Sequence, residues 1–454
     1  MNINNLSPVY LKMKNMLFRK STACLALFIV LLFVLWSPLL KQSGMTISSA
    51  DNLLLYPPFN DSYKGYFPYN TLLNDQFTQF YPWMAFNHNE IVRNKRFPLW
   101  NPHQEMGIPH WANTQNAALS IQHLPVYFFS LEKALNIRAF FTVFFAFWGC
   151  FLFFRLLSKD YLMAFIGAMA FALGGFIMVW LGHPHSGVAM WLGWLFWAFF
   201  RLFKKPSVRR MVYLSIFLFL SYLGGHIETA FHNVIILSAF AVVFLLLERS
   251  RPPKKRVYIF FLFIMAGIIS FFLAAIYFFP FIEYLLRSWT YFARREMIPA
   301  GGAGHSFVYL LNFFAPDIFG NPTQQLWLVP QLGANYNEVN GGFFTFSLLV
   351  MVLPGLILAG KINRSVRLAT FFLFFLCFSF VYRVPVLNYF LNNLPLLNVG
   401  VNMRFVYGIG FMGITLGIMG WKEIIENKRK PLFFLLVIFT VDFIGFSFLG
   451  LILI

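Results

Sequence analysis

Charged residues are scarce in this sequence, and acidic residues are scarcer than basic ones. Only 11% of the 454 residues are charged, whereas 59% are hydrophobic. A chain this poor in charge is not typical of a soluble globular protein, and we exclude that class. The composition instead indicates a protein that crosses a membrane several times, and the 62 phenylalanines suit helix faces that contact lipid.

Cysteine is rare, and the common nucleotide-binding motifs are missing from the sequence. The three cysteines, Cys24, Cys150 and Cys377, lie singly in apolar segments, which predicts neither a disulfide framework nor a cysteine metal site. The chain has no Gly-x-x-x-x-Gly-Lys-Ser/Thr loop and no dinucleotide-binding fingerprint. We therefore do not expect a cytosolic nucleotide to be the direct donor or energy source.

The net charge of +19 does not indicate nucleic-acid binding, because basic residues gather between apolar runs. With the N-terminus inside, the inner segments hold 23 of the 35 Lys and Arg, as the positive-inside rule requires. The sequence thus predicts one all-α integral membrane domain over 1–454, with an uncleaved signal anchor and long outer loops at 41–136 and 287–341. About eleven spans are expected, at 21–40, 137–157, 162–182, 186–203, 211–225, 229–247, 257–280, 342–360, 366–382, 403–421 and 431–453.

All nine histidines fall on or near the outer side of this predicted topology. Imidazoles and carboxylates are costly at membrane depth, so gathering them on one side predicts a polar site that opens outward. The histidines are His88, His103, His110, His123, His183, His185, His226, His232 and His305.

Asp75 is the candidate catalytic residue. It precedes a predicted amphipathic helix with Pro82 near its first turn, and a second helical stretch is expected near 116–135; both would lie at the membrane interface. A carboxylate there could take a proton from a sugar hydroxyl whose partner is a lipid-linked phosphate. The alternative is an N-cap for the following helix. Asp51 and Asp61, in the same loop, are interpreted as solvated residues.

Two short motifs between spans carry further candidates. His183 and His185 flank Pro184, where two imidazoles could donate to a phosphate or bind a divalent cation with one carboxylate; the alternative is a polar turn. Gly224-Gly225 predicts a break before a helix that starts near His226. On that helix Glu228 and His232 would share a face, either as a functional group or as a mutually satisfied pair.

Several arginines fall on the predicted outer side, although the positive-inside rule disfavours basic residues there. A guanidinium can hold a phosphate by two parallel hydrogen bonds, and Arg404, at the mouth of a span, is the preferred phosphate ligand. Arg294 and Arg295 could equally contact lipid headgroups. Asp317 and Glu338, in the second long loop, could line an acceptor cleft or bind a cation, or could serve the folding of the loop.

Five stretches in the right order resemble the YfhO family of bacterial membrane proteins, which is similar to the GT-C glycosyltransferases. The resemblance covers about 50–421. Because many relatives continue with further spans and an outer domain, we expect this chain to be a fragment or a short variant. The stretches are Asp75-Gln76 with Phe97-Pro98-Leu99-Trp100-Asn101-Pro102, then Gly182-His183-Pro184-His185, Gly224-Gly225-His226-Ile227-Glu228, Pro316-Asp317 with Asn337-Glu338, and Arg404.

The resemblance implies a multi-pass enzyme of the bacterial cytoplasmic membrane with its active site on the outer face. GT-C enzymes need an acidic residue in the first outer loop, and Asp75 matches that position. The enzyme would move a sugar, with inversion, from a polyprenyl-phosphate donor to a cell-envelope polymer or glycolipid. A divalent cation such as Mg²⁺ or Mn²⁺ could assist. The alternatives are a transporter or flippase of lipid-linked sugars and a non-catalytic assembly factor.

Overall fold

The computed structural model describes residues 8–41, 50–62, 73–296, 304–313, 316–322, 336–344, 352, 355, 364–385, 389–390, 393–394 and 397–426. Across these ranges the protein is helical and has no β-strand; an isolated antiparallel bridge joins Asn101 and Ile108. The predicted all-α class is therefore confirmed.

Seven helical stretches of the described chain are long and apolar enough to cross a membrane. The predicted span 211–225 corresponds to the shorter α10 (Val208–Tyr222), and 21–40 to the apolar part, Lys20–Leu35, of α1 (Pro8–Leu35). Most of 342–360 and all of 431–453 lie outside the described residues, so the total of eleven stays a prediction. The seven are Leu131–Ser158, Tyr161–Val179, Pro184–Lys204, Ile227–Leu247, Pro253–Leu273, Arg364–Tyr382 and Asn402–Ile424.

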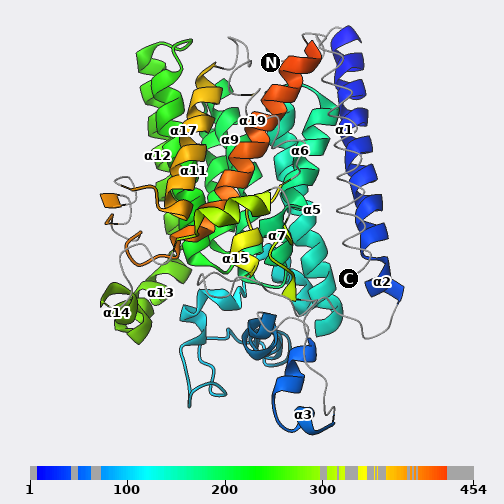
Figure 1. Ribbon diagram of the computed structural model, residues 1–454, viewed down its shortest axis with the longest axis vertical. Helices are drawn as coiled ribbons and strands as arrows, with labels where there is room; N and C mark the ends of the chain where they lie inside the picture. Colours follow the sequence, from blue (N-terminus) through cyan, green and yellow to red (C-terminus); the bar gives the residue numbers. More distant parts are fainter. Residues whose placement is uncertain are drawn as a thin grey trace.

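The long helices form one bundle around α19 (Val406–Glu426), as Figure 1 shows. The Phe411 ring of α19 lies 5.0–5.7 Å from rings of Phe153, Phe154, Phe171 and Phe196, which come from three other helices. Phenylalanine thus fills the interior as well as the surface. Around α19 lie α5 (Leu131–Ser158), α6 (Tyr161–Ala172), α9 (Leu192–Lys204), α11 (Ile227–Leu247) and α17 (Arg364–Tyr382), and α12 (Pro253–Leu273) packs farther out, mainly against α10.

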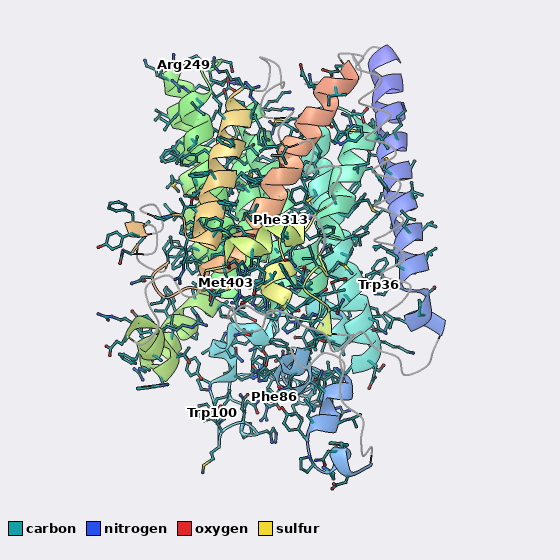
Figure 2. The ribbon with its side chains drawn as sticks, in the orientation of Figure 1. Trp36, Phe86, Trp100, Arg249, Phe313 and Met403 are labelled. Atoms are coloured by element: carbon teal, nitrogen blue, oxygen red, sulfur yellow. The ribbon has the colours of Figure 1, made fainter. Side chains whose placement is uncertain are left out.

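The bundle has two unlike ends. Residues 73–129 gather at the lower end in Figure 1, which we call the loop end; Phe86 and Trp100 mark it in Figure 2. The connections between α9 and α10 and between α11 and α12 lie at the opposite end, marked by Arg249, which we call the basic end. These basic connections share one end as predicted, while the side of the membrane that each end faces stays a prediction.

The loop end is built from short helices, and one predicted helix is absent there. A π-helical turn, Gln76–Phe80, runs into α4 (Tyr81–His88), which has Pro82 in its first turn as predicted, and a second π-helical turn spans Asn89–Arg93. The stretch 116–135 is not one helix, because Ala117 takes a left-handed conformation (φ 49°) and Ser130 is extended. Its last residues belong to α5, which begins at Leu131, six residues before the predicted span 137–157.

The remaining short elements are α2 (Ser37–Lys41), α3 (Phe59–Ser62), α7 (Gly175–Val179), α8 (Pro184–Ala189), α13 (Ala275–Arg287), α14 (Trp289–Glu296), α15 (Tyr336–Asn340) and 3₁₀ turns at Ala50–Leu55, His110–Ala112, Thr114–Asn116, Ile121–Tyr127, Phe307–Phe313 and Asn402–Phe405.

Candidate functional site

Several helices are interrupted near the loop end, and polar side chains occupy the interruptions. A turn at Gly224-Gly225 separates α10 from α11, which confirms the predicted break. Gly225 has φ +99°, and a Cβ there would lie 2.7 Å from the Cβ of Ala117, so both the conformation and the close approach require glycine. α11 then begins at Ile227, with the His226 imidazole accepting a hydrogen bond from the Thr229 N–H.

Glu228, in the first turn of α11, lies at the centre of a charged group. Its Oε1 accepts a hydrogen bond of 2.5 Å from the Val401 N–H and lies 3.7 Å from Arg404 Nη1. Its Oε2 lies 3.3 Å from Arg294 Nη1, and the other end of the Arg404 guanidinium is 3.7 Å from Glu338 Oε1. The structure therefore brings together Glu228, Glu338 and Arg404, which lie far apart in the sequence.

Stacked rings extend this group into the protein. The His185 ring lies between Trp180, at 4.3 Å, and His226, at 3.8 Å between centroids. The Arg404 guanidinium carbon lies 5.7 Å from the Trp180 ring, and the His183 ring meets Trp180 edge-on at 5.0 Å. We call His183, His185, His226, Glu228, Glu338 and Arg404 the polar cluster. Its three histidines are each less than a tenth exposed.

His232 shares the face of Glu228 as expected, but the two do not form the self-contained pair that the sequence allowed. The Glu228 carboxylate is engaged by the two arginines and by the Val401 backbone. The His232 ring instead lies against Phe405, 4.1 Å between centroids, and its Nδ1 has no partner among the described residues. Glu228 thus joins α11 to α14 and to the segment before α19.

Asp75 stands at the edge of this group on an exposed position. It does not cap the following turn; its Oδ1 instead accepts a hydrogen bond of 3.1 Å from Gln79. Partial burial raises the pKa of the Asp75 carboxyl, which makes it a stronger base than a solvated aspartate. The adjacent Gln76 is buried, and its amide nitrogen lies 3.4 Å from His183 Nδ1, so the Asp75 turn contacts the polar cluster directly.

Asp317 and His305 have other surroundings. The exposed Asp317 accepts a hydrogen bond of 2.8 Å from the Tyr336 hydroxyl, two residues before Glu338 on α15, and no hydrogen bond or ion pair joins Asp317 to the polar cluster within the described chain. His305 is buried between the rings of Tyr309 and Tyr382, at 5.8 and 6.1 Å. Burial lowers the pKa of His305 to about 4, so its ring is neutral at pH 7.

The charges of the polar cluster depend on Glu338. Burial raises the pKa of the Glu338 carboxyl, against the opposing effect of Arg404. Burial and the nearby charges of Arg138 and Arg404 lower the pKa of His183 to about 3.

Within the described part of the chain, no three His, Cys, Asp or Glu side chains converge closely enough to hold a metal ion.

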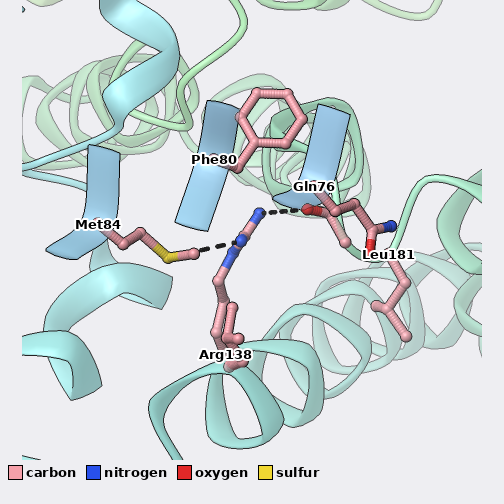
Figure 3. A pocket seen from close by; sticks show the side chains of 7 residues that line it. Gln76, Phe80, Met84, Arg138 and Leu181 are labelled. Carbon is pink, nitrogen blue, oxygen red and sulfur yellow. Dashed lines mark hydrogen bonds between the residues drawn. The ribbon is translucent and has the colours of Figure 1, made fainter. Parts of the chain in front are cut away.

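Sequence reasoning missed Arg138, in the second turn of α5. Its side chain is only 3% exposed and lines a small pocket with Gln76, Phe80 and Met84, as Figure 3 shows. One signal was present, because a lone arginine inside an apolar run is costly and therefore a functional candidate. The prediction treated it as part of the span 137–157.

No known protein family matches this chain, and no curated protein is significantly similar to it. The resemblance to the YfhO family therefore rests on the five sequence stretches alone.

Proposed function

We propose that the protein is a membrane glycosyltransferase that moves a sugar from a polyprenyl-phosphate donor to a hydroxyl of a cell-envelope polymer or glycolipid. The observation that carries the proposal is the contact between the Asp75 turn and the polar cluster through Gln76 and His183. A base and a group of positive charges at one end of a membrane bundle are the two parts that such a transfer needs.

In the proposed reaction the Asp75 carboxylate takes the proton of the acceptor hydroxyl. The acceptor oxygen attacks the anomeric carbon, and the bond from that carbon to the phosphate oxygen breaks on the opposite face, so the configuration inverts. The polyprenyl phosphate leaves with the bonding electrons, and the proton stays on Asp75 until water accepts it. The raised pKa of Asp75 favours the first step.

Arg404 is the proposed partner of the departing phosphate. Arg294 and Arg404 carry two positive charges, which Glu228 and Glu338 balance only while both are ionised. Burial raises the pKa of the Glu338 carboxyl, so Glu338 takes up a proton more readily than a solvated glutamate does, and its protonated form would leave the group with one net positive charge. A sugar phosphodiester carries one negative charge, so proton uptake by Glu338 on binding would keep the group neutral. The three imidazoles of the polar cluster would supply hydrogen-bonding groups for the sugar.

The test is transfer of a radiolabelled sugar from a polyprenyl-phosphate donor into the envelope fraction, in membranes that contain the wild-type chain or a variant. Asp75→Asn is expected to lose at least roughly a hundredfold in rate, since a general base contributes about that much. Asp61→Asn is the matched control, because Asp61 lies exposed on α3 in the same loop. Equal rates in wild type and Asp75→Asn would remove the mechanism, and movement of unaltered labelled lipid across the bilayer would favour a transporter.

A further inference from the structure

Arg138 carries a buried positive charge that no acidic side chain among the described residues compensates. Four other arginines, Arg96, Arg287, Arg294 and Arg404, each lie within 4 Å of a glutamate. No acidic side chain in the described ranges lies within ion-pair distance of Arg138. An arginine stays protonated even when buried, so an unpaired one is strongly destabilising.

The contacts of Arg138 are weak ones. Its Nη2 lies 3.4 Å from the Gly182 carbonyl oxygen, and its Nη1 lies 3.9 Å from the Met84 sulfur. Its Nε is buried and has no partner among the described residues. A guanidinium has five N–H donors, and these contacts leave most of that capacity unused. The side chain is therefore held in place without being satisfied.

The guanidinium is also aimed into a pocket at the loop end. Figure 3 shows it beneath the turn that carries Gln76 and Phe80, with Met84 and Leu181 on either side. Gly182 contributes to the shape, because a Cβ there would lie 2.0 Å from the Gln76 amide nitrogen. The open volume is about 10 Å³, which suits one water molecule, so a larger guest enters only when the flexible Gln76 side chain moves aside.

We infer that Arg138 binds a phosphate group. The planar fork of a guanidinium matches two phosphate oxygens, and the Gln76 amide lies in the same pocket as a further donor. Arg138 lies seven residues after the start of α5, which corresponds to ~10 Å along the helix. A lipid headgroup at the membrane surface can reach that depth, and so can free phosphate from solution.

This site deepens the proposed function. Phosphate binding at Arg138 is independent of that function, whereas the assignment of the sugar-donor lipid as the bound ligand rests on it. Arg404 is already held between two carboxylates, whereas Arg138 is free of them. Gln76 lines the Arg138 pocket and follows Asp75 in the chain. A phosphate at Arg138 would therefore place the group it carries close to the proposed base.

The test uses the purified full chain in a neutral detergent, with the melting temperature as readout and three probes: dodecyl phosphate, inorganic phosphate and dodecanol. Dodecyl phosphate is expected to raise the melting temperature saturably, and dodecanol is not. Arg138→Met is expected to weaken dodecyl phosphate binding roughly tenfold or more, the usual contribution of a charged hydrogen bond. Arg287→Met, an exposed arginine on α13, is the control and keeps the wild-type response.

A purely structural role for Arg138 makes a different prediction. If the fold needed this charge, Arg138→Met would melt at a markedly lower temperature without ligand; removal of an uncompensated charge instead leaves the melting temperature unchanged or raises it. Arg138→Lys keeps the charge but loses the fork, so it tests the site in a chain that folds, and its affinity is expected to fall several-fold.

The outcomes distinguish a lipid phosphate from a soluble phosphate, and they test the Arg138 site separately from the proposed transferase. Stabilisation by dodecyl phosphate alone assigns a lipid phosphate, and equal stabilisation by inorganic phosphate at the same concentration assigns a soluble one. The inference is overturned if neither probe stabilises the wild type, or if Arg138→Met and Arg138→Lys respond as the wild type does. Binding that depends on Arg138 in a protein without sugar transfer would leave this site standing and remove the transferase.

Discussion

The two ends of the bundle use arginine in opposite ways. At the basic end, Arg210 donates to the carbonyl oxygens of Arg201 and Lys205 at the end of α9, and Arg256 donates to those of Leu245 and Leu246 at the end of α11. At the loop end, Arg404 is half-buried and Arg138 is buried among helices, with carboxylates beside the first and a small pocket beside the second. Charges at the basic end complete helix ends, whereas those at the loop end carry a cost of burial, which makes them candidates for a functional role.

The largest difference between the ends is expected when a carboxylate is neutralised. Glu228→Gln leaves Arg294 and Arg404 without their shared partner in a largely buried place, so the free energy of unfolding is expected to fall by about 3 kcal/mol. The matched change at the basic end is Glu426→Gln, whose exposed carboxylate pairs with Lys422 at 3.7 Å. That loss is expected to stay below about 0.5 kcal/mol.

Thermal melting of the two variants in one detergent measures this contrast. An equal loss of stability in both variants would show that burial does not strengthen the contribution of the Glu228 ion pairs to stability. The distinction between the two ends would then fail.

Acid is expected to destabilise the protein through the loop end. Burial lowers the pKa of His110 from 6.5 to about 4, and its Nε2 lies 2.9 Å from Asn87 Oδ1. Below pH 6.5 the unfolded chain binds a proton that the folded chain refuses, so stability falls as the pH drops from about 6.5 to about 4 and is fully present above that window. For His110 the loss amounts to on the order of 2 kcal/mol at pH 5.

Melting curves of wild type and His110→Gln between pH 7.5 and 5 measure this contribution. The variant should lose less stability on acidification than the wild type. A slope identical to that of the wild type would show that His110 is protonated in the folded protein, contrary to its buried position.

Hydrophobic runs and glycines predicted much of the fold, because these features act locally. The spanning helices follow from runs of about twenty apolar residues, and the break before α11 follows from Gly224-Gly225. The partners of Glu228 could not be predicted, since Arg294, Arg404 and the Val401 backbone reach it only through packing of distant segments. Arg138 was hidden for the opposite reason, because one charge barely changes the hydropathy of a 28-residue helix.

The smallest effect is expected from an arginine of the basic end. Arg210→Ala removes two hydrogen bonds, of 2.8 and 2.9 Å, to carbonyl oxygens at the end of α9. Water can replace this exposed donor, so the loss is expected to be at most about 1 kcal/mol in the free energy of unfolding. Lys204, Lys205 and Arg209 stay in the same connection, so the predicted topology is expected to persist. Melting temperature reports the first expectation, and labelling of a single cysteine placed in this connection reports the second. A loss as large as that of Glu228→Gln would mean that exposed caps and buried ion pairs contribute alike, and the unequal roles of arginine at the two ends would need another explanation.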